Sequence, residues 1–308
     1  MGSKVDHAET ARLIHRAFEL GVNFFDTADV YARGEAERAV GEALLSLPRH
    51  RVVLATKCFF AMSEDPNDRG LSRKHLFESV EGSLRRLRTD YIDLHQCHRA
   101  DPDTPMEETV RAYEDLIRQG KLLYWGVSQW SAAQIGEACE IADAFGAYRP
   151  ISSQPQYSIL RRQIESEVLS RSEREGLGQI VFSPLAQGAL TGKYRDGEIP
   201  PESRANDPER NRWMADYLDP ATLQRVEALR PLASGLGVSM AQLALAWCLR
   251  HASVASAIVG ATRSEQLEEN VAAAELVIPE EVLERIDAIF PGPKPLAPTR
   301  PERAAARP

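Results

Sequence analysis

The chain has 308 residues, of which 43% are hydrophobic and 27% charged, a composition typical of soluble globular proteins. Its 37 basic and 45 acidic residues give a net charge of −8, which argues against nucleic-acid and membrane-surface partners. No run approaches the roughly 20 apolar residues of a spanning helix, and the first residues lack the apolar stretch of a secretory signal. We therefore expect a cytoplasmic protein whose four cysteines, without a CxxC pair, are reduced thiols.

A first amphipathic helix is predicted over Ala8–Leu20, and seven short apolar runs follow it. Most of these runs are apolar at both odd and even positions, as expected of parallel strands that are buried on both faces. The predicted strands are Val22–Thr27, Val52–Lys57, Tyr91–His98, Leu122–Ser128, Ile151–Tyr157, Gln179–Ser183 and Ala255–Ala261.

Helix signals lie between the strands. Ser131 and Ser239 are each followed three residues later by a glutamine, and Thr104 is followed by Glu107, the capping-box pattern of a helix start. Glycines that follow helical stretches are expected to end them in the left-handed conformation. These are Gly21, Gly120 and Gly146.

Strands and helices that alternate at this spacing predict a parallel α/β protein. The chain length favours a (β/α)8 TIM barrel over a doubly wound sheet, and no GxGxxG motif opens a βα unit. Only seven strands are counted, because nothing before the first helix has a strand pattern. We expect a single barrel domain over residues 1–291, a long loop over residues 193–218 and a disordered tail over residues 292–308.

Ionisable residues gather where the predicted strands end, which is where barrels build their active sites. Lys57 ends an apolar strand and needs a carboxylate there, which Asp26 at the end of the preceding strand supplies. Tyr31 follows Asp26, and a nearby ammonium favours its phenolate form. With His98 to hold a substrate oxygen, this set can protonate a developing alkoxide. A purely structural ion pair is the alternative, and a second is an aldolase in which Lys57 forms a Schiff base.

Other residues near this set are expected to be structural. We predict core packing for His95, Cys58 and Cys97, and a solvated loop position for Asp29. No metal site is predicted from His95 and His98, because no further ligands recur at metal spacing.

Two further segments are candidates for ligand contacts. The segment from Gly260 to Arg263 leads from a strand into a helix whose start favours a phosphate, and Arg263 offers a planar donor fork for it. A solvated charge is the alternative for Arg263. An apolar substrate pocket is predicted to be walled by Phe59, Phe60, Met62 and Trp130, with packing at the barrel top as the alternative.

A series of segments resembles, in order, the motifs of the aldo-keto reductase superfamily: FFDTADVY, LATK, DYIDLHQCH, GVSQW, SQPQYS, FSPLAQGALTGKY and IVGATRSEQLEEN. Two more resemble the branch that contains the voltage-gated potassium channel β-subunits and their bacterial enzyme relatives: DTPMEETVRAYEDLIRQGKLLYWGVSQWS and AWCLR. The resemblance covers Lys4 to about Ile289, and we expect a bacterial enzyme of this branch.

The resemblance implies NADPH-dependent reduction of aldehydes or ketones to alcohols, with Tyr31 as proton donor and Asp26, Lys57 and His98 completing the catalytic set. The resemblance gives the histidine role to His98 and not to His95, because the family histidine directly precedes an R/x-P-D stretch. In this chain Arg99, Ala100 and Asp101 stand in that place. A small-molecule carbonyl substrate is expected, and a homo-oligomer is left open. The alternative is a nucleotide-binding regulatory protein with little or no turnover.

The resemblance also implies an NADP(H) site built from three groups of residues. The nicotinamide contacts are Ser128, Gln129, Gln154 and Phe182. The pyrophosphate path is lined by Ser183, Pro184, Leu185, Gln187 and Lys193, and covered by Arg204 of the long loop. The 2′-phosphate and adenine contacts are Gly260, Thr262, Arg263, Gln266, Glu269 and Asn270.

The sequence departs from the family before its first helix. In the family a hairpin and a first barrel strand precede that helix. We therefore expect a barrel of seven strands with two unpaired edges, either open or closed by another segment or subunit.

Overall fold

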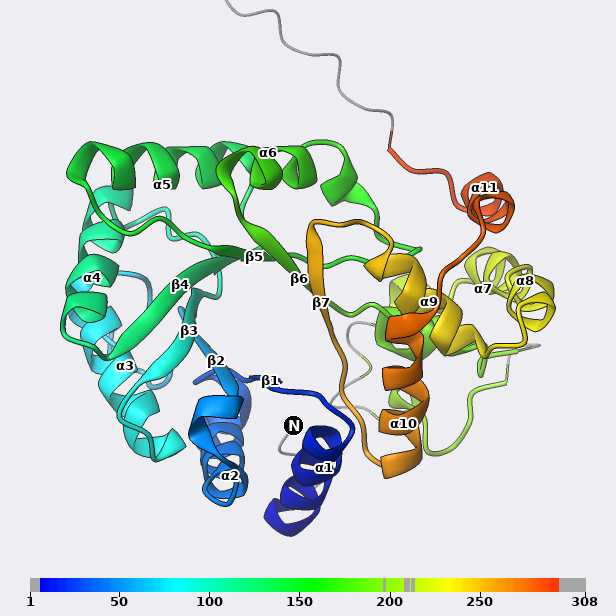
Figure 1. Cartoon of the computed structure of the whole chain (residues 1–308), viewed down its shortest axis with the longest axis horizontal. Coiled ribbons are helices and arrows are strands. Elements are labelled where there is room, and N and C mark those ends of the chain that lie inside the picture. The colour runs from blue at the N-terminus through cyan, green and yellow to red at the C-terminus, as the bar shows by residue number, and fades with distance from the viewer. Residues whose placement is uncertain (1–5, 196–197, 208–210, 212–213, 294–308) are drawn as a thin grey trace, which may run out of the picture.

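The computed structural model describes residues 6–195, 198–207, 211 and 214–293. Seven strands form one parallel sheet in which each strand pairs with the next along the chain, and this sheet curves into a nearly closed barrel (Figure 1). The strands are β1 (Phe24–Asp26), β2 (Val53–Cys58), β3 (Ile92–Cys97), β4 (Leu122–Ser128), β5 (Ser152–Gln154), β6 (Gly178–Phe182) and β7 (Val254–Ile258). All seven predicted strands are confirmed. The predicted tail lies outside the described residues, apart from Gly292 and Pro293.

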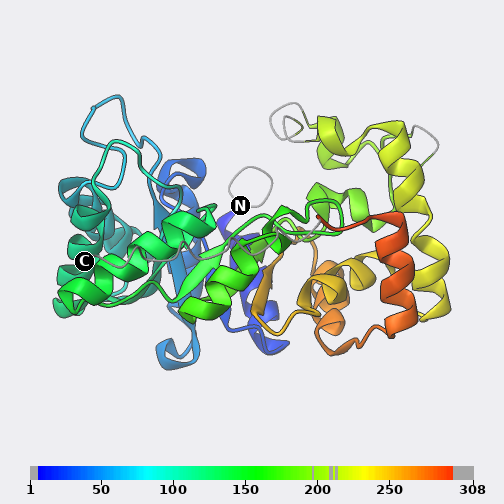
Figure 2. The ribbon, with the colours of Figure 1, turned by 90° about the horizontal axis from the view of Figure 1, so that it is seen from above.

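Helices cover the outside of the strands, and a further group lies at one end of the molecule (Figure 2). The covering helices are α1 (His7–Glu19), α2 (Glu35–Leu44), α3 (Arg73–Leu87), α4 (Met106–Arg118), α5 (Ala132–Phe145), α6 (Val168–Glu175), α9 (Met240–Leu249) and α10 (Ser264–Ala272). The end group comprises α7 (Pro220–Glu227), α8 (Arg230–Gly235) and α11 (Glu280–Ile289). None of the described helices is by itself long and apolar enough to span a membrane; α7 and α8 taken with α9, bent by 90°, reach that length and hydropathy.

The predicted helix caps are confirmed with one exception. Ser131 and Ser239 form complete capping boxes at the starts of α5 and α9. The three glycines predicted to end helices all have positive φ. The prediction for Thr104 is wrong, because α4 begins after Pro105 without a side-chain cap. The Thr104 hydroxyl donates instead to Oδ2 of Asp101 at 2.8 Å.

Side chains alternate between the inside and the outside of the barrel, because successive residues of a strand point to opposite faces. The outward side chains pack against the helices in two large hydrophobic clusters. A small inner cluster fills the barrel and comprises Phe24, Ala55, Leu94, Ile180 and Ile258. Two residues further along β1, β2 and β3, on this inner face, stand Asp26, Lys57 and Gln96. The alternation thus places a polar layer directly above the apolar one.

A seam separates β1 from β7, and no pairing joins these two strands within the described ranges. Helices α1 and α10 lie side by side across the seam (Figure 1). Arg16 pairs with Glu268 at 2.6 Å, and Arg12 donates to the hydroxyl of Ser264 at 3.3 Å. In the described part of the chain, side-chain contacts between helices therefore connect the two edges of the sheet.

Candidate active site

Asp26 and Lys57 form a buried ion pair at the carboxyl ends of β1 and β2. Nζ of Lys57 donates to Oδ2 of Asp26 at 2.5 Å and to the carbonyl oxygen of Thr27 at 2.8 Å. The Lys57 side chain is fully buried and that of Asp26 is 6% exposed. A buried ammonium is tolerated only when it is paired and hydrogen-bonded, so these contacts hold Lys57 charged and in one orientation. They occupy two of its three N–H donors.

The other oxygen of Asp26 accepts two amide donors. Nε2 of Gln154 lies 2.9 Å from Oδ1 of Asp26, and Nε2 of Gln96 lies 3.3 Å from it. The backbone oxygen of Gln154 in turn accepts a hydrogen bond from Oγ of Ser128 at 2.8 Å. Gln96 was not predicted as a site residue, although alternation along β3 puts it on the same face as His98.

Tyr31 lies over this ion pair and is the first residue of a tight turn that follows β1. Ala32 and Arg33 have left-handed backbone conformations, with φ of 49° and 51°. Nζ of Lys57 lies 5.4 Å from the centre of the Tyr31 ring. The His98 ring meets the Tyr31 ring edge to face, with 5.7 Å between their centres. The four residues predicted as the catalytic set therefore lie together, and Tyr31 remains 37% exposed at the barrel mouth.

The two histidines of β3 and its end occupy different environments. Burial, followed by the nearby charges of Lys57 and Arg99, lowers the pKa of His98 to about 3, so its imidazole is neutral near pH 7. Its Nδ1 has no hydrogen-bond partner among the described residues. His95 faces outward, where its Nδ1 lies 3.0 Å from the hydroxyl of Tyr113. The prediction that His95 packs in the core is confirmed.

The prediction that Asp29 is a solvated loop carboxylate is wrong. Its side chain is fully buried and accepts hydrogen bonds from the Val30 amide at 2.6 Å and from Oγ of Ser79 at 3.1 Å. Burial, followed by the charge of Glu37, raises the pKa of Asp29 to about 7. The turn between Asp26 and Tyr31 folds Asp29 behind β2, because the Asp29 amide donates to the carbonyl oxygen of Lys57 at 3.1 Å.

The loop after β6, predicted to follow the pyrophosphate, has an unusual backbone. Ser183, Ala186, Gln187 and Gly188 all have positive φ. Turns of this kind direct successive backbone N–H groups to one side and suit an anion. A Cβ at Gly188 would lie 3.0 Å from Nζ of Lys193, so the glycine lets this cation approach the loop closely.

The other residues predicted for this stretch fall beside the same loop. Phe182 ends β6, Pro184 and Leu185 continue from Ser183, and Nε2 of Gln187 donates to the Ser183 hydroxyl at 2.6 Å.

The start of α10 carries the residues predicted for the 2′-phosphate. Arg263 is the N-cap residue of this helix and is exposed, with no ion pair to another described residue. Oε1 of Gln266 accepts a hydrogen bond from the Thr262 amide at 2.9 Å and so orders the turn into the helix. Asn270 is partly buried and Glu269 exposed further along α10, whereas Gly260 precedes the turn. A helix start with a free-standing guanidinium suits a phosphate.

Two predicted cofactor residues lie in loops around the barrel mouth. Gln129 directly follows β4 with a φ of 59°, and its Oε1 accepts the Gln156 amide at 2.9 Å. Arg204 begins a short 3-10 turn in the loop over residues 193–218. This loop contributes its own small cluster of buried side chains, namely Tyr194, Ala205 and Met214. Residues 196–197, 208–210 and 212–213 of the loop lie outside the description.

Trp130 and Phe59, predicted to wall the substrate pocket, contact the core. Trp130 is 3% exposed within the large outer cluster, and Phe59 is partly buried against it. The neighbouring Phe60 is the ring that meets His98, edge to face with 4.9 Å between centres. The geometry thus favours the packing alternative for Phe59 and Trp130 and brings Phe60 to the site.

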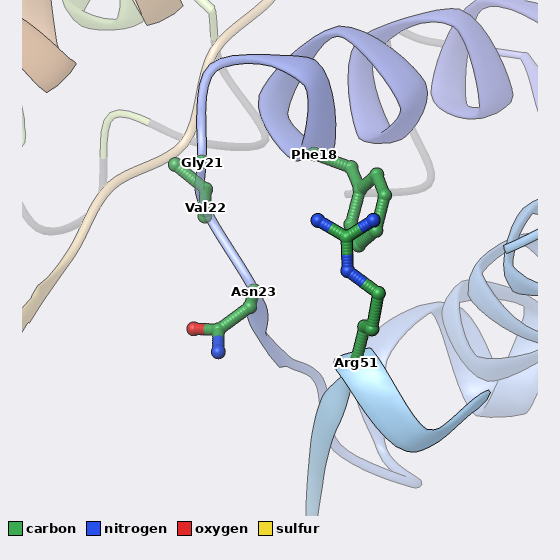
Figure 3. A pocket seen from close by; sticks show the side chains of 5 residues that line it. All are labelled: Phe18, Gly21, Val22, Asn23 and Arg51. Carbon is green, nitrogen blue, oxygen red and sulfur yellow. The ribbon is translucent and has the colours of Figure 1, made fainter. Parts of the chain in front are cut away.

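A separate pocket lies between the end of α1 and the starts of β1 and β2, and Figure 3 shows the side chains that line it. It is lined by Phe18, Gly21, Val22, Asn23 and Arg51, which precede β1 and β2 in the chain. The guanidinium of Arg51 lies 4.8 Å from the centre of the Phe18 ring. Because barrel active sites are built at the carboxyl ends of the strands, this pocket is not the candidate site.

Comparison with known families agrees with this geometry. The model of the Aldo/keto reductase family matches residues 1–290. The chain belongs to the aldo/keto reductase family. Membership supports an oxidoreductase and, in general terms, a nicotinamide cofactor.

Similar proteins in this family come from plants and a yeast. Proteins named "Probable voltage-gated potassium channel subunit beta" match in Oryza sativa subsp. japonica, at 45% identity over 94% of this chain and 89% of that protein, and in Arabidopsis thaliana, at 42% identity over 98% and 92%. A putative subunit of the same name in Schizosaccharomyces pombe is 41% identical over 94% of this chain and 86% of its own length. The resemblance to this branch is confirmed, whereas a bacterial source stays a prediction.

Proposed function

We propose that this aldo/keto reductase reduces aldehydes or ketones to alcohols with NADPH, and that Tyr31 is its general acid. The observation that carries the proposal is the buried Asp26–Lys57 pair beneath the exposed Tyr31 ring, with His98 at its edge. A purely structural ion pair needs neither an exposed phenol nor a neutral imidazole beside it. A Schiff-base aldolase is disfavoured, because a lysine held charged by Asp26 is a poor nucleophile.

The residues around the barrel mouth fit the cofactor. The loop Ser183–Gly188, in which four residues have positive φ, suits the pyrophosphate together with Lys193. Arg263 at the start of α10 suits the 2′-phosphate that distinguishes NADP from NAD. Ser128, Gln129, Gln154 and Phe182 at the ends of β4 to β6 are proposed to hold the nicotinamide. When bound, NADPH supplies the hydride that the carbonyl carbon accepts.

Each catalytic side chain has a distinct role in proton transfer. The Tyr31 hydroxyl donates its proton to the carbonyl oxygen, and the Lys57 ammonium stabilises the phenolate that remains. Asp26 keeps Lys57 charged and oriented. Because its pKa is about 3, His98 is neutral and donates a ring N–H to the substrate oxygen without transferring its proton.

The Tyr31→Phe variant tests the proposal. Loss of a general acid typically costs between about 100- and 10,000-fold in rate, so we expect a fall of that size in kcat/KM for aromatic aldehydes. NADPH consumption measures the rate. The affinity for NADPH, measured by fluorescence titration, should stay unchanged. Tyr124→Phe is the matched control, because Tyr124 is exposed near the amino-terminal end of β4, away from the candidate site. Unchanged turnover in Tyr31→Phe would contradict the assignment.

The second candidate is a nucleotide-binding regulatory protein with little or no turnover. The names of the relatives describe channel subunits and so bear only on its regulatory role. The same measurements separate the two functions. NADPH binding without consumption across the aldehyde panel in the wild-type chain would favour the regulatory protein.

A further inference from the structure

Arg99 presents a positive charge at the mouth of the candidate active site. Its Nη1 donates to the backbone oxygen of His98 at 2.6 Å, which fixes the base of the guanidinium beside the catalytic set. Its guanidinium carbon lies 5.4 Å from the centre of the Phe60 ring, and that ring meets His98. The Arg99 side chain is half-buried. The charge is therefore held in place by a backbone carbonyl and an aromatic face.

The charge on Arg99 is not neutralised by a carboxylate in the described part of the protein, where it has no ion pair within 4.0 Å. Asp101, two residues along the chain, uses Oδ2 to accept the Leu71 amide at 2.7 Å and the Thr104 hydroxyl at 2.8 Å. Burial lowers the pKa of Arg99, yet a guanidinium stays protonated in proteins. A partly desolvated, uncompensated cation is costly unless a ligand supplies the missing anion.

We propose that Arg99 binds a carboxylate on the substrate, so that the preferred substrates are aldehydes or ketones bearing a carboxylate a short apolar spacer away from the carbonyl. The inference rests on the proposed function, since it takes the carbonyl to lie between Tyr31 and His98. The planar donor fork of Arg99 matches a carboxylate, and the Phe60 ring provides an apolar surface for the spacer. One guanidinium balances the single charge of a carboxylate, whereas a phosphate monoester carries closer to two.

Paired substrates that differ only in charge test the proposal. We would compare 4-carboxybenzaldehyde with its neutral methyl ester, using the full chain with NADPH, in the wild type, Arg99→Met and Arg99→Lys. We expect the wild type to prefer 4-carboxybenzaldehyde to the ester. Arg99→Met should raise the KM for 4-carboxybenzaldehyde roughly 10- to 100-fold, the effect of losing one charge-assisted hydrogen bond. The KM for the ester should change less than about twofold in Arg99→Met, and Arg99→Lys should retain part of the preference for the carboxylate.

Two controls separate a specific contact from a change in overall charge or fold. Arg118→Met removes the same charge from an exposed position on α4 and should leave the ratio of kcat/KM for the carboxylate to kcat/KM for the ester unchanged. Rising salt should lower kcat/KM for the carboxylate and spare the ester in the wild type, and this difference should vanish in Arg99→Met. An equal effect of Arg99→Met on both substrates would overturn the proposal.

The outcome also distinguishes this inference from the proposed function. If the ester is reduced and Arg99→Met does not alter the ratio, the reductase stands and the carboxylate site fails. If neither aldehyde is reduced, the reductase fails, and direct binding of the two aldehydes by calorimetry decides the inference. Binding of the carboxylate that is weakened by Arg99→Met would then support it, and equal binding of both aldehydes would overturn it.

Discussion

At the scale of single residues, the charges behind the barrel mouth are compensated to different degrees. Lys57 and Asp26 neutralise one another. Glu37 is fully buried but pairs with Nε of Arg86 at 2.6 Å. Among the described residues Asp29 forms no ion pair, and it accepts hydrogen bonds from Val30 and Ser79. The more distant charge of Arg86 offsets only part of the effect of burial on the pKa of Asp29. Ionising Asp29 therefore costs free energy in the folded protein, which is why its pKa is raised to about 7.

The Asp29→Asn variant should change how stability depends on pH. In the unfolded chain Asp29 ionises near the ordinary pKa of an aspartate, 3.8, whereas in the folded protein it stays protonated until about pH 7. The wild type therefore loses stability as pH rises through this window, and asparagine avoids that loss. Urea unfolding between pH 5 and pH 8 should show the advantage of Asp29→Asn growing up to about pH 7 and levelling above it. Asp90→Asn, at an exposed position, is the control, and a pH-independent difference would refute the buried neutral acid.

At the scale of elements, the starts of α5 and α9 are encoded locally. Oγ of Ser131 accepts a hydrogen bond from the backbone amide of Gln134, and Oε1 of Gln134 accepts one from the backbone amide of Ser131. This reciprocal contact needs no distant partner. The failed prediction at Thr104 has a tertiary cause. There the hydroxyl is drawn to Asp101, whose carboxylate also orders the loop before α3 through Leu71.

Removing the hydroxyl of Ser131 should destabilise the protein by about 1 kcal/mol, the usual contribution of an N-cap. Ser131→Ala is compared with Ser131→Gly, which should recover most of this loss because glycine is also a favourable N-cap residue. The stability of both variants is measured from the midpoint of denaturant unfolding, provided that the slope m stays the same as in the wild type. Equal losses in the two variants would show that the cap does not contribute as described.

At the scale of the whole molecule, the seam makes the barrel uneven. β3 and β4 pair on both sides, whereas β1 and β7 pair on one side only within the described residues. The contacts of α1 with α10 across the seam include the exposed Arg16–Glu268 pair. Exposed ion pairs contribute little, so these contacts hold the edges less firmly than strand pairing holds the centre.

Hydrogen exchange should reveal this gradient. We expect the amides of β3 and β4 to exchange most slowly and those of β1 and β7 to exchange sooner, because edge strands open locally at lower cost. Arg16→Ala should accelerate exchange in α10 and leave β3 unchanged, with Arg118→Ala on α4 as the control. Uniform protection of all seven strands would argue against an open seam.

Much of the fold and the outline of the site were predictable from local pattern. Short apolar runs and capping signals are encoded by neighbouring residues, so seven strands and two helix starts followed from them. Alternation within HQCH separates His98 from His95 and could have identified Gln96 as well. Asp29 could not be placed in this way, because its burial depends on α3, fifty residues further along the chain.

The sequence by itself determined the order of strands and helices, the family motifs and the residue types at each strand end, because all of these depend on neighbours in the chain. Tertiary structure alone decided which charges are compensated. It paired Lys57 with Asp26, buried Asp29 without an ion pair to any described residue, and left Arg99 facing the barrel mouth beside Phe60. Charge compensation depends on distance and burial between segments far apart in sequence, and only the folded chain sets these.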